Sequence, residues 1–322
     1  MADSPFGRRQ EEYNAMKMKS TGILLVSVCV ITLALARYAP GIGETAGKSA
    51  GAAGNRTVYF GVIPRDNPRI AYEKYQPIID FLSESTPYTF ELVLKKSYAD
   101  TVSALGRGAI DIAFLSPLTY LHAHAEFRAT PVLKSITDKG VPFYRSVIIV
   151  RQDSALDRLQ DLGGKEFAFA ALQSTSGNLI PRFLLADEGI HVTELGGYQH
   201  FNYHDTVVKW VLKGKYDAGA VRDSVAERYL PLGLKIIATS EPIPTGPVVS
   251  GPAASPEVIE AVRDELMLLK KTAAGERLLK KLDPEFRGGF VPATDSDYDK
   301  IRQMINGVPK GCGIRCHPGI EL

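Results

Sequence analysis

The sequence predicts an α/β protein with two lobes, each a mainly parallel β-sheet flanked by helices. Apolar runs of strand length alternate with segments of helical periodicity along the chain. This alternation starts a second time near residue 146, and the chain later returns toward its first part. The 322 residues, with 45% hydrophobic content, are enough for two lobes with sizeable cores. Two lobes joined by two crossings would leave a ligand cleft between them.

The first lobe is expected to contain residues 57–145 and 245–306. Its helix at 71–85 carries Tyr75, Ile78 and Ile79 on one apolar face. The other expected elements are strands at 57–62, 90–94 and 110–115, a helix at 100–107, and closing helices at 256–271 and 295–305. Strands that alternate with helices favour parallel pairing.

The second lobe is expected to contain residues 146–244. Its elements, in chain order, are strands at 146–150 and 167–171, a helix at 179–186, a strand at 198–201, a helix at 206–212 and a strand at 216–221. The chain then returns to the first lobe near 240–249.

The N-terminal segment is predicted to lie outside the folded body. A polar stub at 1–20 carries four basic residues, and an uncharged apolar run follows at 21–36. Sixteen residues are short for a membrane span and near the upper limit of a signal-peptide core. An uncleaved inner-membrane anchor and a signal cleaved after the Ala-Leu-Ala at 34–36 therefore both stay open. Either places the body on the outer side of the membrane, beyond a Gly/Ala-rich linker at 37–56.

Three hydroxyls and a glycine lie where a helix is expected to begin. Ser174, Thr175, Ser176 and Gly177 follow a strand-like run and precede the helix at 179–186. The first turn of a helix has free backbone N–H groups and the positive end of the helix dipole, so it can hold a phosphate-like anion. An ordinary Ser/Thr helix cap is the alternative, although a cap needs only one hydroxyl.

A series of short motifs runs through the body in a fixed order. They are Val62-Ile63-Pro64-Arg65, Lys96-Ser97-Tyr98-Ala99-Asp100, Gly108-Ala109-Ile110-Asp111-Ile112-Ala113, Ser116-Pro117-Leu118-Thr119-Tyr120, Tyr144-Arg145-Ser146-Val147, Ser174-Thr175-Ser176-Gly177 with Pro181, His204-Asp205, Asp217-Ala218-Gly219-Ala220 and Ser240-Glu241-Pro242-Ile243-Pro244. By these motifs, residues 57–305 resemble the periplasmic phosphate-, phosphite- and phosphonate-binding proteins of ABC transporters. The resemblance implies the two-lobe type II periplasmic binding protein fold. It also implies hinges near 144–146 and 240–243 and delivery of a small phosphoryl oxyanion to a membrane permease.

The resemblance also implies which residues contact the ligand. Carried over by position, they are Tyr98 and Tyr144 from one side, Ser174, Thr175 and Ser176 from the other, and His204 opposite, with Asp205 and Ser116 beside them. Hydroxyls, phenols and N–H groups can satisfy the oxygens of a buried anion without a cofactor. Plain packing of the tyrosines, a helix cap at Asp205 and a strand-end turn at Ser116 remain alternatives.

The sequence departs from the family at two positions. Members that bind aminoalkylphosphonates resemble one another in placing acidic residues near the ligand amine, and the positions that align with them here are Ser224 and Gly246. Neither residue is acidic, which favours phosphate, phosphite or a simple alkylphosphonate.

The C-terminal tail, residues 307–322, carries Cys312, Cys316 and His317 outside the family pattern. Two cysteines followed directly by histidine are typical of covalent haem c attachment with the histidine as axial ligand, here with three residues between the cysteines instead of two. A local disulfide or free thiols are the simpler interpretation, and a metal site that lacks a fourth ligand is the third.

The leading function is therefore a non-enzymatic binding protein that serves a membrane permease. The sequence shows no nucleophile–base pair and no P-loop, and a net charge of +2 gives no electrostatic support for nucleic-acid binding. A membrane-anchored haem subunit of a larger membrane complex, built on a binding-protein fold, is the alternative because of the cysteine tail. An extracytoplasmic sensor is a third hypothesis, but the stub at 1–20 is too short for a signalling domain.

Overall fold

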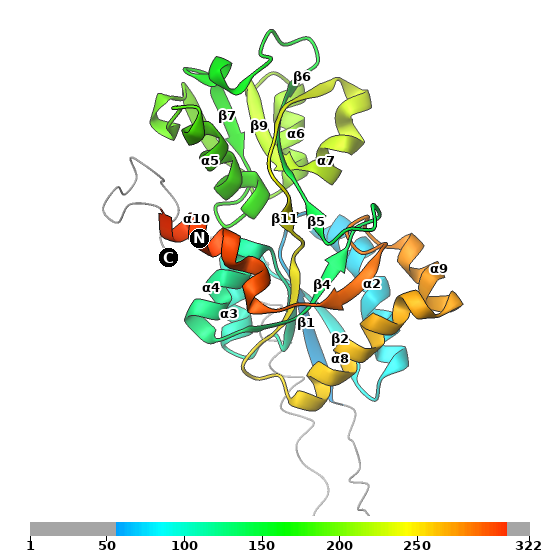
Figure 1. The fold of residues 1–322 in the computed structure, drawn as a ribbon. Helices are drawn as coiled ribbons and strands as arrows, with labels where there is room; N and C mark the ends of the chain where they lie inside the picture. Colours follow the sequence, from blue (N-terminus) through cyan, green and yellow to red (C-terminus); the bar gives the residue numbers. More distant parts are fainter. Residues whose placement is uncertain (1–55, 308–322) are drawn as a thin grey trace, which may run out of the picture. The chain divides into compact units, whose positions relative to one another are not determined.

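Two β-sheets organise the computed structural model, which describes residues 56–307 (Figure 1). All of these residues belong to one compact unit of the chain. The first sheet contains, in spatial order, β13 (Gly289–Pro292), β4 (Thr130–Ile136), β12 (Pro247–Ser250), β3 (Ile112–Phe114), β1 (Thr57–Val62) and β2 (Thr89–Leu94). The second contains β10 (Leu234–Thr239), β6 (Ser146–Arg151), β9 (Ala218–Arg222), β7 (Glu166–Phe169) and β8 (Gly197–His200). The expected α/β class with two helix-flanked sheets is confirmed.

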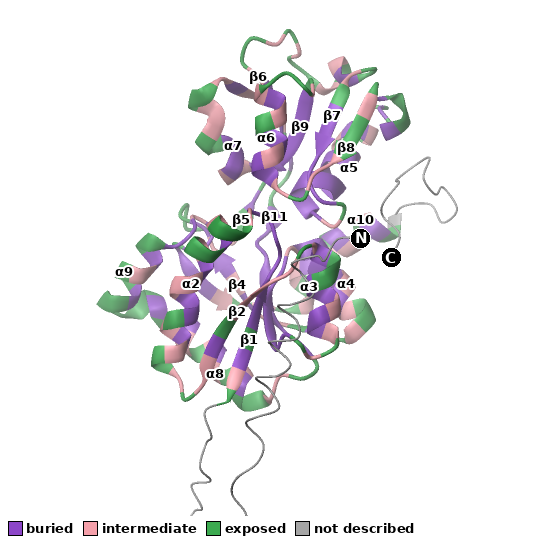
Figure 2. Ribbon diagram, turned by 180° about the vertical axis from the view of Figure 1, so that it is seen from behind, coloured by how far each residue is buried: buried purple, intermediate pink, exposed green. Residues whose placement is uncertain are grey.

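Helices cover both faces of the first sheet. Val58, Phe60 and Val62 alternate along β1 and share one apolar cluster with residues of α2 (Pro68–Ser85), α8 (Pro256–Leu268) and α9 (Ala273–Lys281). A second cluster joins the sheet to α3 (Tyr98–Gly106), α4 (Pro117–Phe127) and α10 (Asp299–Gly307). Figure 2 shows the sheet strands largely buried and the exposed residues gathered on the outer sides of the helices.

Helices also cover both faces of the second sheet. Val147 and Ile149 of β6 point into a cluster with α6 (His204–Leu212) and α7 (Asp223–Tyr229), whereas Ile148 and Val150 point into a cluster with α5 (Ile180–Asp187). Because consecutive side chains of a strand face opposite sides, the continuous apolar run at 147–150 is explained by burial of both faces of this sheet. Short 3₁₀ turns lie at Leu159–Leu162, Val192–Glu194, Leu230–Leu232, Leu269–Lys271 and Asp295–Tyr298.

The strand directions differ from the expectation of mainly parallel sheets. Three of the five neighbouring pairs in the first sheet are antiparallel, as are two of the four in the second. Parallel pairing holds only for β2-β1-β3 and β8-β7-β9, which belong to strand–helix–strand units. No strand was predicted at β4, β10 or β13, and all three pair antiparallel. For the strands that were predicted, an apolar run carries no information about strand direction.

One helix starts earlier than its apolar pattern. The helix expected at 71–85 begins at Pro68, because Asn67 Oδ1 accepts a hydrogen bond from the Ile70 N–H at 3.2 Å and caps the first turn. Proline suits the next position, where its missing N–H removes no helix hydrogen bond.

Two short crossing strands connect the sheets. β5 (Phe143–Tyr144) and β11 (Ile243–Pro244) pair antiparallel to each other, and Figure 1 shows them between the two sheets. Next to them, the Ser146 N–H donates to Ser240 Oγ at 3.0 Å and the Ser240 N–H donates to the Ser146 carbonyl at 2.9 Å. The two crossing segments therefore hold each other near the residues where hinges were expected.

The N-terminal stub, the apolar run at 21–36 and the linker lie outside the described residues, apart from Arg56, as does nearly all of the C-terminal tail. Among the described residues, no helix has the length and apolar character that crossing a membrane requires.

Candidate functional site

A cavity is lined by residues from both sheets and from the loops that follow their strands. Seven of the eight residues expected to contact a ligand line it: Tyr98, Ser116, Tyr144, Ser174, Thr175, Ser176 and His204. The other lining residues are Ile63, Arg65, Phe114, Leu115, Pro117, Arg222, Gly246 and Glu285.

The hydroxyl loop is a buried turn that leads from β7 into α5. Ser174 caps a π-helical turn, Thr175–Leu179, by accepting a hydrogen bond from the Gly177 N–H at 3.0 Å. Gly177 is required there, because a Cβ atom would lie 2.2 Å from Ala170 Cβ and 3.1 Å from His204 Cε1. The loop is therefore pressed against both β7 and His204.

His204 is a neutral, fully buried side chain. Its Nδ1 accepts a hydrogen bond from the Arg222 backbone N–H at 3.2 Å, so the ring proton of the neutral imidazole is on Nε2. Nε2 lies 3.3 Å from Ser174 Oγ and can only donate to it. Burial, together with the charge of Arg65, lowers the pKa of His204 to about 3.

The Ser174 hydroxyl is consequently oriented by its neighbours. Its oxygen accepts hydrogen bonds from the Gly177 N–H and from His204 Nε2–H. With both acceptor positions occupied, the hydroxyl can only donate its proton, either to the Tyr98 phenol beside it or into the cavity. His204 thus orients the Ser174 hydroxyl in this arrangement.

The two tyrosines add protonated donors from the opposite side. Tyr98 opens α3 and Tyr144 lies in the crossing strand β5. Burial raises the pKa of Tyr144 to about 12 and raises that of Tyr98 further. Side-chain hydrogen bonding with Thr175 and Ser176 partly offsets the rise for Tyr144, as Ser174 does for Tyr98. Both phenols therefore stay protonated at neutral pH and face the hydroxyl loop.

A direct hydrogen bond joins the two lobes beside the cavity, and further bonds hold the residues on each side of it. The Leu118 N–H, in the first turn of α4, donates to Thr175 Oγ1 at 2.9 Å. Ser116 caps the same helix and its Oγ contacts Thr119 Oγ1 at 2.6 Å. Ser176 contributes its carbonyl, which accepts from Ser146 Oγ at 2.6 Å. The first turn of α4 and the hydroxyl turn that precedes α5 thus meet at the cavity.

Asp205 does not line the cavity. Its carboxylate accepts a hydrogen bond from Arg228 Nη2 at 3.1 Å. Successive residues of a helix are turned by about 100°, so a helix that points His204 toward the cavity points Asp205 elsewhere. The orientation of the His204 ring is fixed by the Arg222 backbone N–H.

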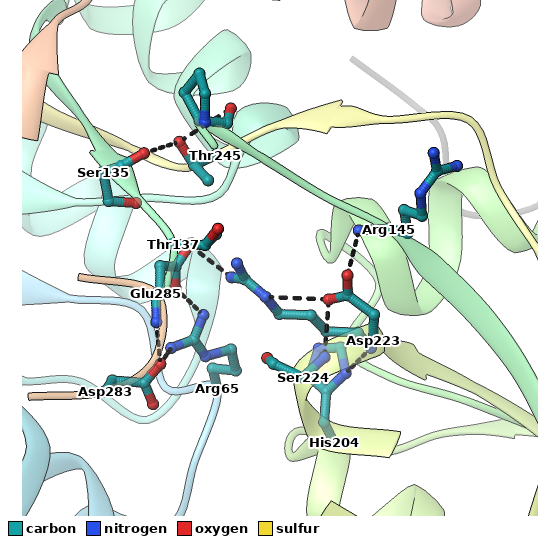
Figure 3. Close-up of polar contacts among 12 residues, drawn as sticks. Arg65, Ser135, Thr137, Arg145, His204, Asp223, Ser224, Thr245, Asp283 and Glu285 are labelled. Atoms are coloured by element: carbon teal, nitrogen blue, oxygen red, sulfur yellow. Dashed lines mark hydrogen bonds and ion pairs between the residues drawn. The ribbon is translucent and has the colours of Figure 1, made fainter. Parts of the chain in front are cut away.

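A buried charge network at the cavity was missed by the sequence analysis. Glu285 pairs with Arg222 Nη1 at 2.5 Å and also contacts Arg65 (Figure 3). The Lys74 ammonium joins Asp66 at 2.9 Å and Asp283 at 2.8 Å, and Arg65 reaches Asp283 at 3.8 Å. Burial alone would raise the pKa of Glu285, but the two arginines lower it below its ordinary value.

With Asp223, which lies 3.9 Å from Arg222 Nε, the network contains three cations and four carboxylates, so it adds no net positive charge to the cavity. Arg65 stands in a motif that the resemblance used, although without an assigned role. Glu285 has no local sequence signal.

Comparison with known proteins then decides the family. The model of a family described as "ABC transporter, phosphonate, periplasmic substrate-binding protein" matches residues 60–298. The chain belongs to this family. It is 28% identical over 275 residues to a phosphate-import protein PhnD of Mycolicibacterium smegmatis, which covers 78% of this chain and 85% of that protein. It is 22% identical to a phosphonates-binding periplasmic protein of Escherichia coli, covering 80% of each.

Solved structures show the same fold. A binding protein component of an ABC phosphonate transporter from Pseudomonas aeruginosa matches with a TM-score of 0.72 and 21% identity, over 78% of this chain and 86% of the other. PhnD1 of Prochlorococcus marinus, solved with methylphosphonate, matches with a TM-score of 0.71 and 18% identity, over 79% of this chain and 99% of the other. This family member accordingly has the type II periplasmic binding protein fold and is a substrate-binding protein of ABC transport.

The expected haem, disulfide or metal at Cys312, Cys316 and His317 lies outside the described residues. Within residues 56–307, no group of three or more His, Cys, Asp or Glu side chains is placed to hold a metal ion.

Proposed function

We propose that this family member captures a small phosphoryl oxyanion, namely phosphate, phosphite or a simple phosphonate, and delivers it to an ABC permease. The observation that supports this most directly is the Ser174 hydroxyl, whose two acceptor positions are occupied and whose proton can take a ligand oxygen as acceptor in place of the Tyr98 phenol. A phosphoryl oxyanion presents mainly acceptor oxygens, and the hydroxyl turn, the two phenols and the helix N-termini present donors.

The charge balance of the site supports recognition by hydrogen bonds. The three cations near the cavity are paired with four carboxylates, so a ligand anion meets no uncompensated positive charge. Its oxygens must then be satisfied by neutral donors in a buried space, which is an effective way to hold an anion when every oxygen is bonded. We propose that Tyr98, Tyr144 and Ser174 supply these bonds directly.

The geometry argues against hydrolytic chemistry at the same residues. Ser174 and His204 lie 3.3 Å apart, which is near the separation of a nucleophile and its base. However, a base needs a free lone pair toward the hydroxyl, and the lone pair of His204 is on Nδ1, where it accepts the Arg222 N–H. The low pKa of His204 also makes it a poor proton acceptor. The pair therefore fits binding and not nucleophilic catalysis.

Titration calorimetry of the purified protein with phosphate, phosphite and methylphosphonate tests the proposal, with acetate as a planar anion of similar size. We expect one site per chain for at least one of the three phosphoryl ligands, and no heat from acetate. Absence of binding for all three, in protein that unfolds cooperatively, would contradict it.

We further propose that residues 21–36 tether the protein to the inner membrane, with the body in the periplasm. This rests on the uncharged apolar run behind a basic stub. Membrane fractionation with N-terminal sequencing checks it: an intact N-terminus in the membrane fraction is expected, and a soluble protein that starts after residue 36 would show a cleaved signal instead.

A further inference from the structure

Arg222 and Glu285 form a buried ion pair across one wall of the cavity. Arg222 is the last residue of β9, and Glu285 precedes β13, so each comes from a different sheet. They are 4% and 2% exposed, and Nη1 and Oε1 are 2.5 Å apart. The other oxygen of Glu285 contacts Arg65, which also lines the cavity.

A second hollow lies on the other side of this wall. Tyr144, Arg222 and Glu285 line both spaces. The remaining residues of the second hollow are Thr137, Asp138, Lys139, Phe143, Asp223, Ser224, Glu227 and Pro284. In Figure 3, Glu285 and Thr137 lie on the side of the first sheet, and Asp223 and Ser224 lie on the side of the second.

The wall is closely packed. The Arg222 guanidinium carbon lies 4.0 Å from the centre of the Tyr144 ring, so the arginine covers the aromatic face while it pairs with Glu285. Asp223 also lies 3.9 Å from Arg222 Nε. Charges therefore hold the guanidinium from both sides of the wall.

We propose that the Arg222–Glu285 pair is the size filter of the site and closes the cavity behind the oxyanion. A ligand whose fourth substituent is an oxygen, a hydrogen or a methyl group fits in front of the pair. A longer substituent would have to enter the second hollow, and this requires separating two buried charges. The inference rests on the proposed function, and it gives the physical reason why the bound oxyanion must carry a small fourth substituent.

The opposite wall adds to this restriction. Gly246 also lines the cavity, and a Cβ atom there would lie 2.2 Å from the Leu115 carbonyl oxygen and 3.0 Å from the Phe114 ring. Position 246 therefore has no space for a side chain, and only its backbone forms that part of the lining. The second hollow, in contrast, shares Tyr144, Arg222 and Glu285 with the cavity.

The test compares methylphosphonate with n-propylphosphonate and measures the ratio of the propylphosphonate dissociation constant to the methylphosphonate dissociation constant. A ratio cancels any loss of affinity that affects both ligands equally. Wild-type protein should bind methylphosphonate at least tenfold more tightly than propylphosphonate. Equal affinity in the wild type would overturn the size filter, and so would failure to bind methylphosphonate in protein that binds phosphate or phosphite. The proposed function itself is contradicted only if phosphate and phosphite also fail to bind.

The decisive variant is Arg222→Ala, because Glu285 keeps Arg65 as its partner when Arg222 is removed. The variant should lower the ratio at least tenfold by joining the two spaces. Arg222→Lys keeps the charge but not the planar cover over Tyr144, and it should lower the ratio by a smaller factor. If Arg222→Ala does not fold, the lysine variant decides alone: an unchanged ratio in folded protein overturns the inference.

Arg228→Ala is the matched control. Arg228 is an exposed arginine of the same lobe and pairs with Asp205 outside the cavity. Its removal should leave the ratio within a factor of two of wild type, and a tenfold change would show that the ratio responds to charge in general and not to the wall.

Discussion

Replacing Ser174 with alanine should weaken both the fold and ligand binding, and a cap variant outside the cavity separates the two effects. The substitution removes the acceptor of the Gly177 N–H, an N-terminal helix cap that contributes about 1 kcal/mol. It also leaves buried His204 Nε2–H without its acceptor, which costs about 1–3 kcal/mol more, so the loss in unfolding free energy should total roughly 2–4 kcal/mol. The lost hydrogen bond to a charged ligand contributes about 1.5–3 kcal/mol, which raises the dissociation constant by roughly 10- to 150-fold.

The assay pairs urea unfolding without ligand and calorimetric titration with the tightest-binding phosphoryl ligand. Thr272→Ala is a matched control, because Thr272 caps α9 by accepting from the Gly275 N–H at 3.0 Å, the same cap geometry at an exposed position that does not line the cavity. It should lose about 1 kcal/mol of stability and keep its affinity. An affinity of Ser174→Ala within threefold of wild type would refute the proposed donor, and an equal loss in Thr272→Ala would show that affinity follows stability alone.

Three further predictions concern other residues around the cavity. Tyr144→Phe keeps the ring beside Arg222 but removes a phenol donor, so calorimetry should show a dissociation constant raised about tenfold, and an unchanged value would remove Tyr144 from the ligand shell. Gly177→Ala should lower the unfolding free energy by about 1–3 kcal/mol in urea and raise the dissociation constant, because the new Cβ collides with Ala170 and moves the hydroxyl turn; full affinity would contradict this close contact. Burial lowers the pKa of His204 from 6.5 to about 3, and the charges of Arg65, Asp66, Arg222 and Lys74 surround the ring. The contribution of the neutral histidine to folding stability is therefore complete above pH 6.5 and is lost as the pH falls toward 3. Wild type should therefore lose about 2 kcal/mol more than His204→Gln between pH 7.5 and pH 5, and parallel pH profiles in urea unfolding would contradict the buried neutral histidine.

The sequence identified the parts of the site that depend on local chemistry. Ser174 and Gly177 stand between a strand and a helix, and a hydroxyl followed by glycine at a helix start has a direct physical meaning. Tyr98, Tyr144 and His204 came from the family resemblance, and the structure places all three at the cavity. Their use as ligand contacts remains a prediction.

The remainder of the site depends on contacts between distant residues. Glu285 meets Arg65 across 220 positions, and nothing near residue 285 indicates a buried carboxylate. Asp205 was expected in the site because it neighbours His204 in the sequence, but helix geometry turns it toward Arg228. Strand direction was similarly hidden, because β4 and β12 look the same as parallel strands in the sequence.

A crystal structure of the protein with methylphosphonate would test the central claim most directly. The account predicts the ligand in the cavity, with its oxygens within about 3.2 Å of Ser174 Oγ and the phenols of Tyr98 and Tyr144, and its methyl group toward the Arg222–Glu285 pair. A ligand held by separated arginine side chains, or bound elsewhere with Ser174 unengaged, would contradict it.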